Sequence, residues 1–499
     1  MGIKIYNTLT HGKEDLVPRD EGKIAMYVCG PTVYNYIHIG NARTFLNFDM
    51  IRRYLEFSGY DVTFVQNVTD VDDKIINRAT EEGDSPQAVA RKYLDAFEED
   101  MAALGVRPPD IAPRATDCIP EMLEVIGGLV EKDYAYESGG DVYFEVSKFP
   151  GYGKLSRRNL EEQQSTGQTE EESRKKRNPG DFALWKAARS GEPSWDSPWG
   201  PGRPGWHIEC STMSVKHLGN GFDIHGGGQD LIFPHHENEI AQAEAYSGGE
   251  RFARYWAHSG MLNIEQEKMS KSLGNIRLLR EVLEEHDADT VRMLMLGTLY
   301  RNPSSFGKDS LAEASASLDR VKNCMFEMKD LLRRFASSKS SPTCSEREVH
   351  VIDFFEQAER DFRSAMDDDF NSAAALGVIF GLVKEINIYM GEVQAFKSPA
   401  AKLMLSEADL LLEKLCGALG LFQGGFQGKP ARSAGAGAEG PEAHAGPTRE
   451  QLIDLLLSVR ERARQTKNFE LADSIRDGLA AMGVRVEDVK DGYRWHLEW

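Results

Sequence analysis

The sequence predicts an α/β protein: a doubly wound parallel sheet, interrupted by an insertion and followed by a helical bundle and a small α+β module. Strand-like runs at 24–29 and 61–68 flank a helical stretch near 42–58, which is how a βαβ unit begins. Beyond Arg277 the apolar residues recur with a period of about 3.6, which indicates helices. Ligands of such sheets bind at the carboxyl ends of the strands, so we expect the functional site there.

Four helices make up the expected bundle, and a separate module follows them. The helical periodicity covers 309–336, 348–366, 372–396 and 405–418. Residues 424–447 are rich in Gly, Ala and Pro, which is typical of a flexible linker. The module after it begins with a helix whose Arg460, Arg464 and Lys467 share one face. It ends in strand-like pieces that contain Tyr493 and Trp495.

Residues 114–205 interrupt the α/β pattern, and we interpret them as an insertion into the sheet domain. Within them, 141–146 has the alternation of a hairpin strand, and the polar, mixed-charge stretch 161–177 is typical of a solvated loop. From Gly205 the strand and helix pattern resumes. The sheet is therefore expected to be built from two separate parts of the chain.

Composition narrows the class of protein. At 499 residues, the chain is long enough for several domains. Its 59 basic and 79 acidic residues give a formal charge of −20, so any contact with RNA must come from local basic patches. The N-terminus lacks an apolar signal core, and no run of about 18 apolar residues predicts a membrane span. Six thinly spread cysteines suit a reducing compartment, so we expect a soluble, cytoplasmic protein.

Two distant segments, 29–41 and 268–272, predict the two halves of an ATP-activating site. His38 and Asn41 lie three residues apart, so in the first turn of a helix they share a face beside backbone N–H groups that favour phosphate. Gly40 permits close approach. The second segment, Lys-Met-Ser-Lys-Ser, offers mobile positive charge where charge builds up as pyrophosphate leaves.

These segments resemble the two signatures of the class I aminoacyl-tRNA synthetases, His-Ile-Gly-His and Lys-Met-Ser-Lys-Ser. Further motifs resemble the cysteinyl-tRNA synthetase family in order and spacing: 29–34, 69–74, 181–186, 195–200, 205–210 and 225–239. The resemblance runs over nearly the whole chain. Asn41 stands where the first signature has histidine, which removes a possible positive charge but keeps a hydrogen-bond donor.

The resemblance implies a domain order that agrees with the periodicity. It consists of a Rossmann-like catalytic domain (1–113 and 206–276), a connective insertion (114–205), a stem-contact region (277–308), the helical bundle (309–423), the linker (424–447) and an anticodon-binding module (448–499). The family also implies a monomer.

The resemblance further implies that Cys29, Cys210, His235 and Glu239 bind one zinc ion. His235 and Glu239 are four residues apart and share a helix face. Zinc binds thiolates well, so a cysteine substrate could ligate through its sulfur while serine could not compete. Because four protein ligands normally close a zinc site, substrate binding implies a fifth ligand or a loosened Glu239. Spacing alone leaves open a solvated helix pair and a buried, inert cysteine.

The remaining site residues that the resemblance implies come from both halves of the sequence. The residues expected at the phosphates are His38, Asn41, Lys268 and Lys271. The residues expected to bind the nucleotide, which carries Mg²⁺, are Gly40, Gly227, Asp230 and again Lys271. The residues expected in the cysteine pocket are Thr69, Trp206 and His225. Taken alone, a glycine triplet is common loop material, a lysine-rich turn is often only solvated, and Trp206 would suit a core equally well.

The implied activity is that of a cysteine–tRNA ligase. L-Cysteine and ATP would form cysteinyl-adenylate and pyrophosphate, and the cysteinyl group would pass to the 3′ end of tRNA(Cys). Two alternatives stay open on the sequence: a related cysteine ligase that acts on a small sugar amine and needs no anticodon module, and a non-catalytic paralogue that binds zinc and RNA.

Overall fold

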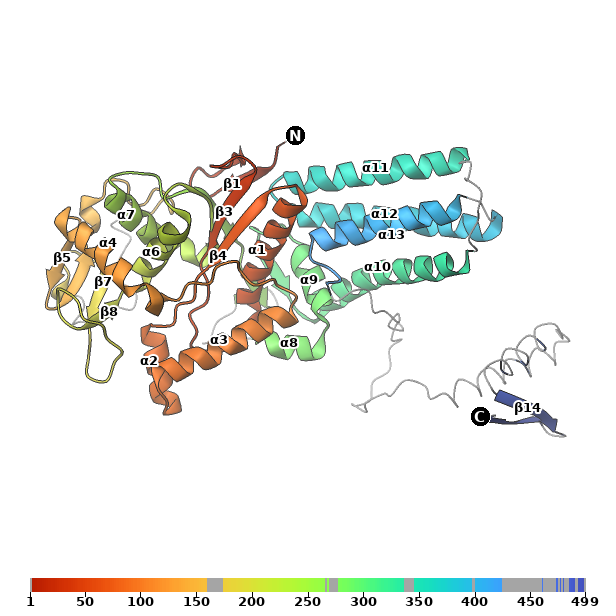
Figure 1. The fold of residues 1–499 in the computed structure, drawn as a ribbon, viewed down its shortest axis with the longest axis horizontal. Helices are drawn as coiled ribbons and strands as arrows, with labels where there is room; N and C mark the ends of the chain where they lie inside the picture. The colour runs from red at the N-terminus through yellow and green to blue at the C-terminus, as the bar shows by residue number, and fades with distance from the viewer. Residues whose placement is uncertain are drawn as a thin grey trace. The chain divides into compact units, whose positions relative to one another are not determined.

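The computed structural model describes residues 2–158, 174–264, 267–268, 277–335, 345–396 and 400–423, and in the C-terminal part 460, 473, 476, 479, 484–489 and 492–497. The chain divides into two compact units, 1–431 and 432–499 (Figure 1). Most of the charged stretch 161–177, the linker 424–447, Arg464 and Lys467 lie outside the described residues.

A four-stranded parallel sheet forms the centre of the first unit. The strand order is β10 (Ala253–Ser259), β9 (Phe222–Gly228), β3 (Lys23–Val28) and β4 (Asp61–Gln66). All three neighbouring pairs run parallel. Every residue of β9 is buried, as expected of a strand covered on both faces. The doubly wound parallel sheet predicted from the sequence is confirmed.

The strand order reverses between β3 and β9, and this places the site. From β3 the chain passes through α1 (Ile39–Phe57) to β4 on one side, whereas β9 lies on the other side of β3. Ligands of open α/β sheets bind at such a switch point, beyond the carboxyl ends of the strands. Cys29, Gly30 and Asp230 lie just past these ends.

Helix α1 lies against the sheet (Figure 1) and approaches β9 closely. A Cβ at Gly226 would overlap the ring of Phe48, so glycine is required there for α1 to pack on the strand. The helix begins where His38, its N-cap, accepts a hydrogen bond at Nδ1 from the Asn41 N–H (3.2 Å). Both features hold the start of α1 at the switch point.

The insertion carries a second, antiparallel sheet. Its strands pair in chain order: β5 (Ala135–Ser138), β6 (Asp141–Phe144), β7 (Phe182–Ala187) and β8 (Gly202–Pro204). The predicted hairpin strand is β6, and β5 is its partner. Gly139 and Gly140 connect them with φ of 62° and 82°, which glycine adopts readily. Helix α4 (Ile119–Glu131) packs on β5, and α6 (Trp206–Leu218) packs on β7, whereas α2 (Asp73–Glu82) and α3 (Pro86–Ala103) pack on each other.

The four helical segments predicted for the bundle appear in the structure (Figure 1). They are α10 (Lys308–Arg334), α11 (Glu346–Asp367), α12 (Ser372–Phe396) and α13 (Ala401–Ala418). By length and composition, Ser372–Val393 could cross a membrane, contrary to the expectation that no such run exists. The charged Lys384 and Glu385 interrupt this stretch, while Ile379, Leu382 and Ile386 are buried. Its apolar face thus serves the core of the bundle.

Short strands and helices complete the first unit, and a hairpin is described in the second. The short strands of the first unit are β1 (Lys4–Asn7) with β2 (Gly12–Asp15), and β11 (Leu262–Ile264) with β12 (Glu267–Lys268) and β13 (Ser304–Phe306). Its remaining helices are α7 (Glu237–Ser247), α8 (Leu279–Glu285) and α9 (Ala288–Leu296). In the second unit, β14 (Val484–Val489) pairs antiparallel with β15 (Gly492–Leu497), which contains Tyr493 and Trp495.

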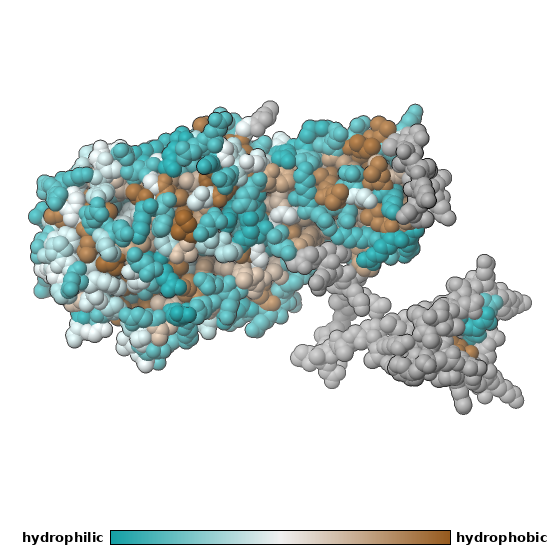
Figure 2. Space-filling view, viewed as in Figure 1, coloured by the Kyte–Doolittle hydropathy of each residue, from teal (hydrophilic) through white to brown (hydrophobic). Residues whose placement is uncertain are grey.

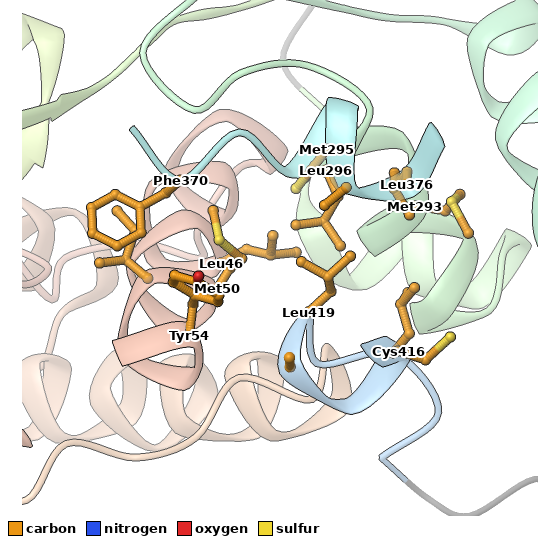
Figure 3. Close-up of a cluster of buried hydrophobic side chains, with 14 of the residues drawn as sticks. Leu46, Met50, Tyr54, Met293, Met295, Leu296, Phe370, Leu376, Cys416 and Leu419 are labelled. Atoms are coloured by element: carbon orange, nitrogen blue, oxygen red, sulfur yellow. The ribbon is translucent and has the colours of Figure 1, made fainter. Parts of the chain in front are cut away.

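A shared apolar core joins the sheet domain to the bundle. Figure 3 shows side chains from α1, α9, α12 and α13 meeting in one cluster. The labelled members are Leu46, Met50, Tyr54, Met293, Met295, Leu296, Phe370, Leu376, Cys416 and Leu419. The rings of Tyr54 and Phe370 meet edge to face, with centroids 6.2 Å apart. Buried contacts of this kind, about 25 cal/mol per Å² of apolar surface, fix the bundle against α1.

A buried ion network crosses the same junction. Asp49 on α1 accepts hydrogen bonds from Arg53 Nε (2.8 Å) and from Arg292 on α9 (2.8 Å). Arg292 also donates to the carbonyl of Leu419, just beyond α13 (3.2 Å). Burial works to raise the pKa of Asp49, but Arg292 and Arg53 outweigh it and lower the pKa below its usual value. One carboxylate thus compensates two guanidinium groups at the start of the bundle.

We expect Asp49→Asn to lower the free energy of unfolding by about 3–5 kcal/mol, because it leaves two buried cations without their anion. Urea unfolding followed by circular dichroism measures the loss at pH 7. The depressed pKa means that the stabilisation is present above the unfolded pKa, about 3.9, and disappears as the pH falls through the lower folded value. The difference between wild type and variant should therefore shrink below about pH 4.

The control for this variant is Glu356→Gln, which removes an exposed partner of Arg360 on α11. Exposed pairs of this kind contribute about 0–1 kcal/mol. Equal losses from the two substitutions would contradict a special role for the buried network.

Candidate active site and metal centre

The four residues predicted to bind metal converge at the switch point. Cys29 follows β3, Cys210 lies on α6, His235 lies in the turn Ile232–His236, and Glu239 lies on α7. All four are buried, and one ligand atom from each lies within 4.8 Å of the others. Two sulfurs, an imidazole and a carboxylate form a donor set that suits zinc.

Hydrogen bonds connect these four side chains directly. Cys29 Sγ lies 3.7 Å from Cys210 Sγ and 3.5 Å from Glu239 Oε1. His235 Nε2 lies 2.9 Å from the same carboxylate oxygen. The ligand atoms thus point toward a common centre and do not face solvent.

The electrostatics of the cluster favour a bound cation. Burial works to raise the pKa of the Cys210 thiol, but hydrogen bonding by Cys29 and by His235 lowers it to about 6. Burial raises the pKa of Cys29 well above its usual value. Burial also acts to raise the pKa of Glu239, but His225 and His235 hold it well below its usual range. Cys210 and Glu239 therefore favour their anionic forms, which bind metal ions.

A second layer of histidines supports the cluster, and sequence reasoning found only part of it. His225 Nε2 lies 2.8 Å from Glu239 Oε2, and His236 Nε2 lies 3.3 Å from Cys29 Sγ. The other nitrogen of His236 bonds Nε2 of His258 at 2.8 Å. Cys29, His225, His236 and Glu239 form a second group within 4.8 Å. The adjacent pair His235-His236 was the signal that could have revealed the second group.

His225, expected in the cysteine pocket, is fully buried and contacts Glu239. Its ring stacks on Trp256, with centroids 4.4 Å apart and planes 14° apart. Its Nδ1 is a buried atom without a hydrogen-bond partner. The stacking on Trp256 holds the His225 ring in place, and its Nε2 orients the carboxylate of Glu239.

The other two predicted pocket residues lie beside the predicted metal ligands. Trp206 begins α6, and its ring stacks on His235 with centroids 4.2 Å apart. Thr69 lies next to the segment after β3, because its backbone N–H donates to Pro31 O (3.1 Å) and its carbonyl accepts from Val33 N–H (3.2 Å). The structure thus brings both residues to the edge of the metal cluster.

Glu209 is a site residue that sequence reasoning missed. Its Oε2 accepts a hydrogen bond from Thr69 Oγ1 (2.8 Å), and the side chain is only 1% exposed. Burial, and after it the Cys210 sulfur, raises the pKa of this carboxyl well above its usual value. Its place directly before Cys210 was the available signal. The hydrogen-bonded pair Thr69 and Glu209 therefore lies next to Cys210, one of the predicted metal ligands.

The first turn of α1 forms the expected phosphate side of the site. His38 and Asn41 are joined by the N-cap bond, and Gly40 follows in the same turn. Ile39 N–H donates to Arg277 O (3.0 Å), and Leu279 N–H donates to Ile37 O (3.0 Å). Lys268 lies in β12, and Lys271 lies outside the described residues. Arg277 and Leu279, which follow the lysine segment in the chain, thus lie beside the start of α1.

Packing also requires glycine at the triplet that ends β9. A Cβ at Gly227 would lie 2.8 Å from Cε1 of His236, and one at Gly228 would overlap the carboxylate of Asp230. Asp230 itself is exposed, in the short turn Gln229–Leu231 after the strand. The triplet therefore lets the second histidine layer and Asp230 approach the strand end.

Comparisons with known proteins agree with this arrangement. Residues 15–316 match the family model described as the tRNA synthetases class I (C) catalytic domain. Residues 361–423 match the DALR domain, and 450–495 match the cysteinyl-tRNA ligase anticodon binding domain. The chain is 50% identical over 498 residues to the cysteine–tRNA ligase of Desulfitobacterium hafniense, covering 100% of both chains.

A second relative supports the same assignment, and a solved structure has a similar fold. The cysteine–tRNA ligase of Pelotomaculum thermopropionicum is 49% identical over 99% of both chains. The methionyl-tRNA synthetase of Mycobacterium tuberculosis, in complex with methionyl-adenylate, has a TM-score of 0.61 and 16% identity, with 80% of this chain and 89% of that chain covered. This likeness shows the fold. The chain therefore belongs to the cysteinyl-tRNA ligase family of class I aminoacyl-tRNA synthetases.

Proposed function

We propose that this protein is an ATP-dependent cysteine–tRNA ligase whose amino-acid specificity depends on zinc. The observation that carries the proposal is the convergence of two thiols, an imidazole and a carboxylate at the switch point of a class I synthetase fold. Cysteine is the amino acid whose side chain such a centre can select.

The reaction has two steps. In the first, an oxygen of the cysteine carboxylate attacks the α-phosphorus of ATP, and the bond from that phosphorus to pyrophosphate breaks. In the second, a terminal ribose hydroxyl of the tRNA attacks the activated carbonyl carbon, and AMP leaves with the bonding electrons. The first step needs no protein nucleophile, because the carboxylate is already ionised. Positioning and charge stabilisation supply the catalysis.

The phosphates of ATP, bound with Mg²⁺, would lie at the start of α1. His38 is held there as the N-cap, and Asn41 lies on the same turn. Gly40 allows the phosphates to approach the backbone. Lys268 and Lys271 would add positive charge from the segment before Arg277, whose carbonyl accepts from Ile39 N–H. Asp230 and Gly227, at the end of β9, would bind the adenosine.

We assign the zinc ligands as Cys29, Cys210, His235 and Glu239. This set contains two sulfur donors, whereas the overlapping histidine group contains one. In that second group, His225 bonds the carboxylate of Glu239, and His236 bonds His258, so both act as supports that orient the ligands. When bound, zinc supplies a soft Lewis acid that prefers a substrate thiolate to a serine hydroxyl.

Thr69 and Trp206 would line the cysteine pocket, with the bond between Thr69 and Glu209 beside them. The indole of Trp206 covers the His235 ring and closes one side of the pocket. His225 would act on the substrate only through Glu239.

The match of 450–495 to an anticodon-binding model supports tRNA as the acceptor over a small sugar amine. The described hairpin of that region carries Tyr493 and Trp495 on β15. The Lys-Met-Ser-Lys-Ser segment and the four metal ligands argue against a non-catalytic paralogue. The five cysteines within the described residues are free thiols, which supports the proposal that the protein acts in the reducing cytoplasm. The monomeric state stays a prediction.

We expect Cys210→Ser to reduce bound zinc well below one ion per chain, because a hydroxyl is a poor replacement for a thiolate ligand. The rate of cysteine-dependent ATP–pyrophosphate exchange should fall with it, by at least about 100-fold. Zinc content is measured by atomic absorption, and exchange is measured with serine as competitor. The matched control is Cys324→Ser on α10, another buried cysteine, which should retain zinc.

Two outcomes would contradict the proposal. Zinc-loaded wild type without exchange would exclude the adenylating activity and favour a binding paralogue. Full exchange in a Cys210→Ser variant that has lost its zinc would exclude the metal from amino-acid selection.

We expect Thr69→Val to raise the KM for cysteine in the exchange reaction about tenfold, because the isosteric change removes the hydroxyl that Glu209 accepts from. Thr69→Ser keeps the hydroxyl and should retain a KM close to that of wild type. Steady-state exchange at varied cysteine, with the melting temperature of each variant, tests this. A valine variant with wild-type KM would show that Thr69 is only a packing residue.

A further inference from the structure

A buried guanidinium group follows the first turn of α1, two residues beyond Asn41. Arg43 is fully buried. Its Nη1 donates to the carbonyls of Gly260 and of Met261 (3.0 Å to the latter), and its Nη2 donates to the carbonyl of Asn302 (2.7 Å). Its Nε is buried without a hydrogen-bond partner. Three neutral carbonyls therefore surround a side chain that carries a full positive charge.

No carboxylate compensates this charge among the side chains that the structure describes. The other two arginines of α1 are paired, Arg52 with Asp110 (2.7 Å) and Arg53 with Asp49 (2.8 Å). Burial lowers the pKa of Arg43 to about 10, which leaves the guanidinium charged at neutral pH. Because a buried charge without a partner is strongly disfavoured, proteins normally pair it or neutralise it. An unpaired one at this place indicates that the charge has a function.

Arg43 lies at the edge of the sheet where we propose that adenosine binds. Gly260 directly follows β10, and the last residue of that strand, Ser259, pairs with Gly228 at the end of β9. Since neighbouring strands are about 4.8 Å apart, the carbonyl that Arg43 contacts lies about one strand spacing from the end of β9. Thr44, the next residue of α1, is close to the same strand end, because a Cβ on Gly228 would lie 3.7 Å from its Oγ1.

The same charge lies close to the proposed phosphate site. Each residue of a helix adds about 1.5 Å along the axis, so Arg43 begins only about 3 Å beyond Asn41. Side chains of a helix lean toward its N-terminus, which brings this one back toward the first turn. In a buried environment salt and water screen a charge weakly, so its field extends to groups that it does not touch.

We propose that Arg43 is a fixed positive charge that strengthens the binding of the triphosphate of ATP. The guanidinium does not contact the nucleotide and acts on the phosphates through its electric field. The carbonyls of Gly260, Met261 and Asn302 hold it in place. The inference rests on the proposed function, and it adds a residue that lies outside both signature segments.

Steady-state ATP–pyrophosphate exchange by the full chain separates the charge of Arg43 from its packing. Arg43→Gln removes the charge, Arg43→Lys keeps it, and both lose part of the contact with the three carbonyls. We expect Arg43→Gln to raise the KM for ATP about tenfold, the size of effect for one unit charge about 10 Å away at an effective dielectric constant of about 20. Arg43→Lys should keep a KM for ATP close to that of wild type. The KM for cysteine and the inhibition constant of adenosine, an uncharged competitor of ATP, should stay unchanged in both.

A second variant compensates the charge and leaves Arg43 in place. Asn47 lies four residues further along α1, on the same face, and it is buried with its amide donating to Ser259 Oγ (2.8 Å). Asn47→Asp introduces a carboxylate of nearly the same shape beside the guanidinium. We expect this variant to raise the KM for ATP as well, again without a change for adenosine. It decides the question if Arg43→Gln does not fold, which the melting temperature of each variant reveals.

The matched control is Arg52→Gln. It changes the net charge of the chain by the same amount as Arg43→Gln, but Arg52 lies nine residues further along α1, about 14 Å from Arg43 along the axis. Its KM for ATP should equal that of wild type. An equal rise in Arg52→Gln and Arg43→Gln would show that only the net charge of the protein matters, and would overturn the inference.

The other contrary results are distinct from one another. A wild-type KM for ATP in folded Arg43→Gln, or in Asn47→Asp, excludes an effect of the charge. Equal rises in Arg43→Gln and Arg43→Lys, or weaker binding of adenosine together with ATP, show that Arg43 only holds the carbonyls in place. Wild type that performs no exchange at all overturns the proposed function, and the inference with it.

Discussion

The buried carboxylate of Glu239 is the group on which the active centre depends. An isolated carboxylate in this interior would be strongly disfavoured, so it must be surrounded by donors. His225 bonds one oxygen at 2.8 Å, and His235 bonds the other at 2.9 Å. Cys29 lies beside the second oxygen as well. Satisfying one charge therefore draws β3, β9 and α7 to a single point, and the same atoms form the donor set for a metal ion.

The parallel sheet explains why that point lies where it does. β3 and β9 are neighbours in the sheet although nearly 200 residues of chain separate them. Each ends at the same edge, with Cys29 after the first and the glycine triplet at the end of the second. The absence of side chains in the triplet lets α1, His236 and Asp230 approach. The start of α1 lies at the same switch point, where we propose that an amino acid and a nucleotide meet.

A second buried group of charged side chains holds the sheet domain and the bundle of the first unit together. Asp49 compensates Arg53 and Arg292 where α1, α9 and the end of α13 meet. The apolar cluster in Figure 3 surrounds this junction. On the surface of the first unit, polar side chains predominate with scattered apolar ones (Figure 2), as is usual for folded proteins. The bundle and the catalytic sheet are consequently joined by a core that excludes water from its ion pairs.

The sequence by itself determined most of the elements named above and predicted the residues that we propose for the chemistry. Period and composition were sufficient for β3, α1, β4 and the helices of the bundle, because local side-chain patterns specify local structure. Family motifs were sufficient to choose Cys29, Cys210, His235 and Glu239. Only the tertiary structure decided that Glu209 bonds Thr69 and that His225 bonds the carboxylate of Glu239. The physical reason is that these contacts join segments far apart in sequence. The distances between such segments are set by packing in three dimensions, which cannot be read from a local sequence pattern.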